Sequence, residues 1–170
     1  MKTAKRLLAL ALAGVMALAL LTGCSDSRSK AKQVEECFRS LMKTRQNVDY
    51  QKDETLDKKL EAIAQQFQPD WLDNRTGGLT EHARTIIINE LRGYLLTGSV
   101  WLWYGEVKPG QSALAQAESM KYSQGIEIAL LDSGIPTLQA IAFTMPGKKS
   151  DGHRYYLALR TNATIKTPQG

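Results

Sequence analysis

The sequence predicts an α+β fold, in which about three N-terminal helices pack on a four-stranded antiparallel curved sheet. Up to about Gly98, apolar residues recur every three or four positions, which is the period of an amphipathic helix. After Gly98, apolar and polar residues alternate, as they do in a strand. A block of helices followed by a block of strands is typical of α+β domains.

Residues 1–23 have the composition of a bacterial export signal. Lys2, Lys5 and Arg6 form a short basic stretch, and residues 7–21 are uncharged and almost entirely apolar. That apolar run is shorter than the roughly 20 residues that a membrane-spanning helix needs. We therefore expect a cleaved signal peptide. An uncleaved N-terminal anchor is the alternative.

The apolar run ends at residues 21–24, Leu-Thr-Gly-Cys, which resemble the lipobox of bacterial lipoproteins. The resemblance implies that Cys24 receives a diacylglycerol on its thiol, that the signal is cut before Cys24, and that further acyl chains such as palmitate are added. Two or three acyl chains hold a protein stably on a membrane. Residues 24–30 are then the lipidated Cys and a short polar tether, and residues 31–170 are a single domain.

The lipobox also implies a location. Ser25, directly after the Cys, resembles the residues that permit sorting to an outer membrane. We expect an envelope protein anchored on the extracytoplasmic side of its membrane, facing the periplasm if the host has an outer membrane. In a bacterium with a single membrane, the same signal implies the outer face of the plasma membrane.

The charge of the mature chain argues against a nucleic-acid partner. The signal contains three of the 22 Lys and Arg and none of the 17 Asp and Glu, which leaves 19 basic and 17 acidic residues and a net charge of about +2. No dense basic patch remains, and nucleic-acid-binding domains depend on one.

A first helix is predicted over about residues 31–50, with a stripe of apolar residues on one face, at Val34, Phe38, Leu41 and Val48. Cys37 lies on the same stripe. Since Cys24 is expected to be lipidated, Cys37 has no partner for an internal disulfide. Unpaired Cys is among the most buried residue types, so we expect Cys37 in the core.

Two further helices follow. The second has Asp53 as its N-cap and ends before Pro69, and its apolar face has Leu56, Leu60, Ile63 and Phe67. The third begins with Thr80 as N-cap and is expected to end near Gly98, with Ala83, Ile87, Leu91, Tyr94 and Leu95 on one face. Because residues 86–88 are all β-branched, a strand is the alternative for that part of the segment.

Four strands follow, over residues 100–107, 120–131, 137–145 and 153–166. Turn residues separate them, among them 132–134 and the hairpin at 146–152. One face of the last strand is polar, and we expect it to face solvent; its residues are Arg154, Tyr156, Arg160, Asn162, Thr164 and Lys166.

This order of elements, over about residues 31–166, resembles the cone-shaped, cystatin-like roll of the nuclear-transport-factor and ketosteroid-isomerase-like superfamily. In that superfamily helices pack on a curved sheet. Exported bacterial lipoproteins and a periplasmic core component of type IV secretion have domains of this kind. A shared fold does not by itself imply a shared function.

The sequence contains no recognisable catalytic or metal-binding motif. His82 and His153 are 71 residues apart, and neither has other ligands at metal-binding spacing. Glu106, Glu118 and Glu127 could face a cavity, but solvated strand residues are the simpler interpretation. We therefore expect no enzyme activity, no metal and no cofactor.

An aromatic cluster is the main candidate for a partner or ligand surface. Trp101 and Trp103 share one face of the predicted strand, Tyr104 lies on the other face, and Tyr94 shortly precedes it. Either the strand is central and buried on both sides, or one tryptophan face lines a pocket or a docking surface.

Three functions remain open at this stage. The first is a non-enzymatic interaction or assembly module that binds an envelope protein, possibly within a secretion or conjugation machine. The second is a lipoprotein that binds a small apolar molecule in a cavity among residues 100–131. The third, which the sequence supports least, is an enzyme. Lys148, Lys149 and the basic residues of the last strand could also contact acidic lipid headgroups.

Overall fold

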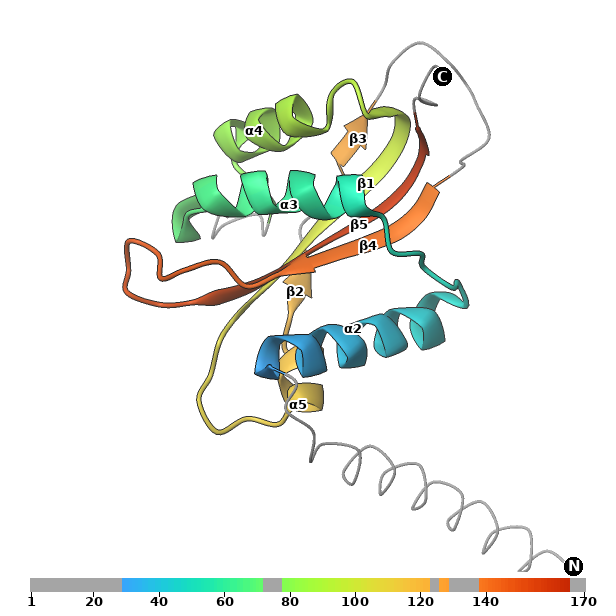
Figure 1. Cartoon of the computed structure of the whole chain (residues 1–170). Helices are drawn as coiled ribbons and strands as arrows, with labels where there is room; N and C mark the ends of the chain where they lie inside the picture. The colour runs from blue at the N-terminus through green and yellow to red at the C-terminus, as the bar shows by residue number, and fades with distance from the viewer. Residues whose placement is uncertain (1–28, 72–77, 123–125, 129–137, 166–170) are drawn as a thin grey trace, which may run out of the picture.

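The computed structural model describes residues 29–71, 78–122, 126–128 and 138–165 (Figure 1). Its helices are α2 (Lys30–Gln46), α3 (Glu54–Gln66), the 3-10 turn η1 (Pro69–Trp71), α4 (Glu81–Leu91) and α5 (Ala113–Glu118). Its strands are β1 (Leu95–Glu106), β2 (Lys121–Tyr122), β3 (Ile126–Ile128), β4 (Leu138–Thr144) and β5 (Tyr155–Ile165). The predicted α+β class, with helices and an antiparallel sheet, is confirmed.

The sheet is antiparallel, in the order β2-β1-β5-β4, and β3 also pairs with β1. The register pairs Trp103 with Tyr122 on β2 and Val100 with Ile126 on β3. The predicted strand 120–131 therefore contributes two short strands to the same edge of β1. The strand β1 is central, because β5 occupies its other edge.

Helices cover both faces of the sheet (Figure 1). The helices α3 and α4 lie on one face, and α2 and α5 lie on the other. This arrangement requires apolar side chains on both faces of the central strands. The first core lies under α3 and α4 and includes Leu56, Leu60, Ile87, Leu102, Leu157 and Leu159. The second lies under α2 and α5 and includes Val34, Phe38, Met42, Trp103, Ile141 and Tyr156.

The predicted helix starts are confirmed. The Asp53 carboxylate accepts a hydrogen bond from the Leu56 N–H at 2.7 Å, and the Thr80 hydroxyl accepts one from the Ala83 N–H at 3.3 Å. These bonds satisfy backbone donors that the first helical turn leaves open. Residues 86–88 are helical, as favoured from the sequence.

The predicted end of the third helix near Gly98 is wrong. The helix α4 ends at Leu91, Gly93 turns the chain with a φ of 86°, and Leu95 already belongs to β1. Gly98 lies within the strand, where a Cβ would be 2.7 Å from the Ala163 Cβ and closer still to the Asn162 carbonyl oxygen. This glycine therefore permits close packing of β1 on β5 and does not end a helix.

The expectation that the even-numbered face of the last strand is solvated is wrong for its first half. Tyr156 is 1% exposed and Ala158 is fully buried, because α2 packs on this face. Arg160 and Asn162, farther along, are partly exposed. Cys37 is only partly buried against the second core. Helix α5, which Ser112 caps, was not predicted.

Several predicted features lie outside the described residues. They are the signal peptide at 1–23, Cys24 and most of its tether, the strand residues 123–125, 129–131 and 137, the turn at 132–134, and Lys166. Within the described ranges, no helix is long and apolar enough to cross a membrane.

Candidate functional site

The four aromatic residues predicted as a surface do not form one surface. Trp103 is 9% exposed and belongs to the second core. Its ring lies between Phe38 of α2, with centroids 5.4 Å apart, and Tyr122 of β2, with centroids 4.9 Å apart. For Trp103, the interpretation as a buried residue of a central strand is confirmed.

Trp101 lies on the same face of β1 but is only partly buried. The guanidinium carbon of Arg160, its register partner on β5, lies 3.8 Å from the centre of the Trp101 ring. This is a cation–π contact. The Arg160 guanidinium covers part of the Trp101 indole, and the rest of the side chain is partly exposed to solvent.

Tyr94 is separated from the tryptophans. It precedes β1 and packs against the first core. Burial and a hydrogen bond to the Asp53 carboxylate raise the pKa of Tyr94. Since Asp53 also caps α3, Tyr94 connects the start of β1 to the start of a helix, which is a structural role.

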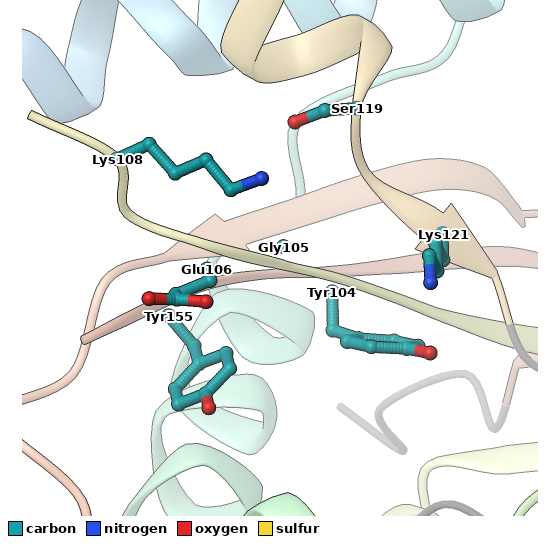
Figure 2. Close-up of a pocket in the computed structure, with 7 residues that line it drawn as sticks. All are labelled: Tyr104, Gly105, Glu106, Lys108, Ser119, Lys121 and Tyr155. Carbon is teal, nitrogen blue, oxygen red and sulfur yellow. The ribbon is translucent and has the colours of Figure 1, made fainter. Parts of the chain in front are cut away.

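Tyr104 lies on the other face of β1 and lines a pocket of about 220 Å³ at the edge of the sheet (Figure 2). In Figure 2, Tyr104, Glu106 and Tyr155 lie on one side of the β1 backbone, and Lys108 and Ser119 lie on the other. The lining residues are Tyr104, Gly105, Glu106, Lys108, Ser119, Lys121 and Tyr155. Most of these residues are polar or charged.

A buried glutamine holds the backbone of this pocket. Gln116 of α5 is 1% exposed; its Nε2 donates to the Glu106 carbonyl at 2.7 Å, and its Oε1 accepts from the Lys108 N–H at 2.9 Å. A Cβ on Gly105 would be 2.9 Å from the Met120 Cγ. The segment from α5 to β2 is therefore packed directly on β1, and this packing forms one wall of the pocket.

Two hydrogen-bonded pairs of ionisable residues border the pocket. His153 Nδ1 and Glu106 Oε1 are 2.6 Å apart, and the Tyr155 hydroxyl donates to Asp151 Oδ2 at 2.6 Å. Burial, and then the bond to Asp151, raise the pKa of Tyr155 to about 12. Burial also raises the pKa of Tyr104.

Sequence reasoning named Glu106 and His153 separately and did not predict that they meet. They are 47 residues apart, and only the pairing of β1 with β5 brings them together. Asp151, Tyr155 and Lys121 were missed as site residues. The sequence signal for them was weak, because charged and tyrosine residues at strand ends are common on any surface.

Of the two hairpin lysines, Lys148 is exposed as expected and Lys149 is not. The ammonium of Lys149 donates to the carbonyl oxygens of Ala64 and Gln65 at the end of α3. Burial lowers the pKa of Lys149. This lysine attaches the β4–β5 hairpin to a helix C-terminus, where cations are favourable, and is not available to a lipid headgroup.

No protein-family model, curated protein or solved structure matches the chain. Resemblance to the lipobox and to the cone-like roll thus depends on sequence pattern and element order. Within the described ranges, no group of three or more His, Cys, Asp or Glu is placed to hold a metal ion. Two features of the site remain to be explained. They are the pocket beside Tyr104 and the exposed Tyr122 of β2.

Proposed function

We propose that this chain is a membrane-anchored lipoprotein of the bacterial cell envelope, and that its domain is a non-enzymatic interaction module that docks onto an envelope protein. A secretion or conjugation machine is the kind of assembly that such a module would serve. The observation that carries the proposal is Tyr122, which is 61% exposed and yet stacked on the buried Trp103.

The anchor follows from the lipobox at Cys24. Helix α2 begins at Lys30, and Ser29 caps it through a hydrogen bond to the Lys32 N–H. The five residues between Cys24 and Lys30 reach at most about 17 Å. A lipid on Cys24 would therefore hold α2, and the adjacent α5, close to the membrane surface. The partner would have to lie at that surface.

The docking surface is the aromatic edge, which we define as Trp103 with Tyr122. Tyr122 and Leu114 of α5 are the exposed large hydrophobic residues in the part of the chain that the structure describes. Tyrosine and tryptophan are enriched among the residues that dominate binding energies. A tyrosine already packed on an indole loses little side-chain entropy on binding.

The opposite edge of the sheet is less suited to docking. Gln51 pairs with β4 through its N–H to the Gln139 carbonyl at 2.9 Å and its carbonyl to the Ile141 N–H at 3.2 Å. Arg39 of α2 also donates to the Ile141 carbonyl at 2.5 Å. Edge strands covered in this way resist pairing with other chains. The β2 edge instead presents exposed side chains at both Lys121 and Tyr122.

The test is cross-linking in native membranes followed by mass spectrometry, with wild-type protein and Tyr122→Ala. We expect one recurrent envelope protein with the wild type and its loss with the variant, because the exposed ring is the proposed contact. Tyr122 is a better position than Trp103, whose truncation would disturb the second core. Unchanged cross-linking of Tyr122→Ala would reject the aromatic edge as the docking surface.

Two controls separate the anchor from the surface. Cys24→Ala should abolish the membrane association and the cross-link together. Gln65→Ala, an exposed position on α3, should leave both unchanged. If the cross-link survives in Cys24→Ala, the lipid anchor is not needed to meet the partner, and the tethered form of the proposal fails.

The alternative function, binding of a small apolar molecule, has one supporting observation. The pocket beside Tyr104 lies among the strands where a cavity was expected. However, charged side chains line it and its volume of about 220 Å³ is small, below the roughly 300–1,000 Å³ usual for ligand pockets. A polar ligand would suit it better than an apolar one.

A further inference from the structure

We infer that the pocket at the edge of β1 binds a dipeptide-sized zwitterion, with the ligand ammonium at Glu106 and the ligand carboxylate at Lys121. This site is independent of the docking surface proposed above. It uses the other face of β1, and Tyr122 does not line it.

The pocket has oppositely charged groups at two register positions of the sheet. Lys121 is the register partner of Tyr104, and Glu106 is the register partner of Tyr155. Tyr104 and Glu106 are two residues apart on β1, so the two pairs are separated by about 7 Å along the strand. Figure 2 also places the Glu106 carboxylate and the Lys121 ammonium at opposite ends of the pocket, so a zwitterion that satisfies both charges needs its ammonium and carboxylate several bonds apart.

A dipeptide has this spacing, because two extended residues span about 7 Å. A single α-amino acid does not, since its charged groups are attached to the same carbon. The pocket volume of about 220 Å³ leaves room for a small ligand of this size.

The acidic end of the pocket is held in position before any ligand arrives. His153 Nδ1 contacts Glu106 Oε1 at 2.6 Å. The second oxygen of Glu106 has no hydrogen-bond partner among the residues that the structure describes. Tyr155 is fixed by its bond to Asp151 and by an edge-to-face contact with Phe67, with ring centroids 5.5 Å apart. An ammonium at Glu106 would therefore meet one open carboxylate oxygen and an aromatic wall.

The basic end is open and adaptable. Lys108 and Lys121 are exposed, and within the described ranges neither forms an ion pair. Lysine side chains are flexible and present a compact charge. We assign the carboxylate to Lys121, because it is the register partner of Tyr104 and therefore lies on the same face of the sheet as Tyr104 and Glu106, whereas Lys108 lies beyond the end of β1.

The test is isothermal titration calorimetry of the full-length protein in detergent with alanyl-alanine. Two matched compounds each lack one charge: N-acetyl-alanyl-alanine has no ammonium, and alanyl-alanine amide has no carboxylate. We expect alanyl-alanine to bind at least about tenfold more tightly than either compound or than free alanine. The inference would be overturned if either compound that lacks one charge bound as tightly as alanyl-alanine. It would also be overturned if alanyl-alanine gave no heat up to about 10 mM.

Variants then assign the two ends. Glu106→Gln should weaken alanyl-alanine at least about tenfold and leave the N-acetyl compound unaffected. Lys121→Met should weaken alanyl-alanine and leave the amide unaffected. A merely structural effect would weaken every ligand alike and would count against the assignment. Glu61→Gln and Lys58→Met, both on the exposed face of α3, are the matched controls.

One further ligand shows whether the pocket recognises the peptide group or only the spacing of the two charges. The linear zwitterion δ-aminovalerate has a similar charge separation but no peptide bond. Binding as tight as that of alanyl-alanine would support the spacing of charges and remove the peptide group from recognition. Weaker binding would support a dipeptide as the ligand class.

Discussion

Single polar residues satisfy backbone groups that the sheet and helices leave open. Gln116 bonds two backbone groups beside Glu106, Arg39 bonds the outer edge of β4, and Lys149 bonds the end of α3. Buried backbone groups without a partner cost about 1–3 kcal/mol each. These side chains therefore keep the sheet edges and the hairpin in place.

The raised pKa of Tyr155, caused by burial and then by its bond to Asp151, predicts a loss of stability at high pH. The folded state holds the pKa of Tyr155 at about 12, above the ordinary tyrosine value of 10.0. A group with a raised folded pKa stabilises the fold fully below the unfolded pKa, and this contribution is lost as pH rises through the folded pKa. We expect the free energy of unfolding to fall between pH 10 and 12, with a share from Tyr155 on the order of 1 kcal/mol after screening by solvent.

Chemical denaturation across this pH range measures the effect. Tyr155→Phe should make the decline shallower, because position 155 then has no phenol to ionise; Tyr94, Tyr104 and Tyr156, whose pKa values are also raised, remain in the variant. Tyr122→Phe, at an exposed position, is the matched control. An equally steep decline in wild type and Tyr155→Phe would show that the ionisation of Tyr155 does not contribute.

At the scale of elements, β1 is the strand on which the rest depends. It pairs with β2, β3 and β5, contributes to both cores, and its C-terminal end forms the pocket. Gly98 lies directly against the β5 backbone, where its φ is +136° and a Cβ would overlap with Asn162 and Ala163.

Gly98→Ala should therefore destabilise the domain by about 3 kcal/mol, through strain at a φ that L residues rarely adopt and through overlap with the β5 backbone. Gly147→Ala is the matched control, since nothing lies within 4 Å of the position that its methyl group would take; it should change stability by less than about 0.5 kcal/mol. Thermal and urea denaturation compare the two. A Gly98→Ala protein as stable as wild type would mean that the strands can separate at this point without cost.

At the scale of the whole molecule, one sheet separates two cores. Leu60 of α3 lies in the first core and Phe38 of α2 in the second, and both are fully buried. Because β1, β4 and β5 contribute to both cores, we expect the domain to unfold in a single cooperative transition.

Leu60→Ala and Phe38→Ala should each lower the free energy of unfolding by about 3 kcal/mol. The double variant should lose nearly the sum, since the sites lie on opposite faces of the sheet. Circular dichroism and tryptophan fluorescence, followed through the same urea titration, should give coincident curves. Separate transitions for the two probes would show that the α2 face folds independently.

Local patterns in the sequence determined the class of the fold and most of its elements. These patterns involve residues that are close in sequence. They are the helical periodicity, the caps Asp53 and Thr80, and the alternation in the strands, and together they predict helices and an antiparallel sheet. The lipobox at Cys24 is likewise a local motif, and the anchoring it implies remains a prediction.

Only the tertiary structure decided which face each helix covers and which distant residues meet. The alternation in β5 does not reveal that α2 returns to bury Tyr156. Nor does the spacing of Glu106 and His153 show that strand pairing places them 2.6 Å apart. Tyr104 was predicted on the face of the strand opposite the tryptophans, but alternation does not reveal that Lys121 of β2 and Tyr155 of β5 form a pocket beside it. These outcomes depend on contacts between residues far apart in the chain, which local periodicity cannot specify.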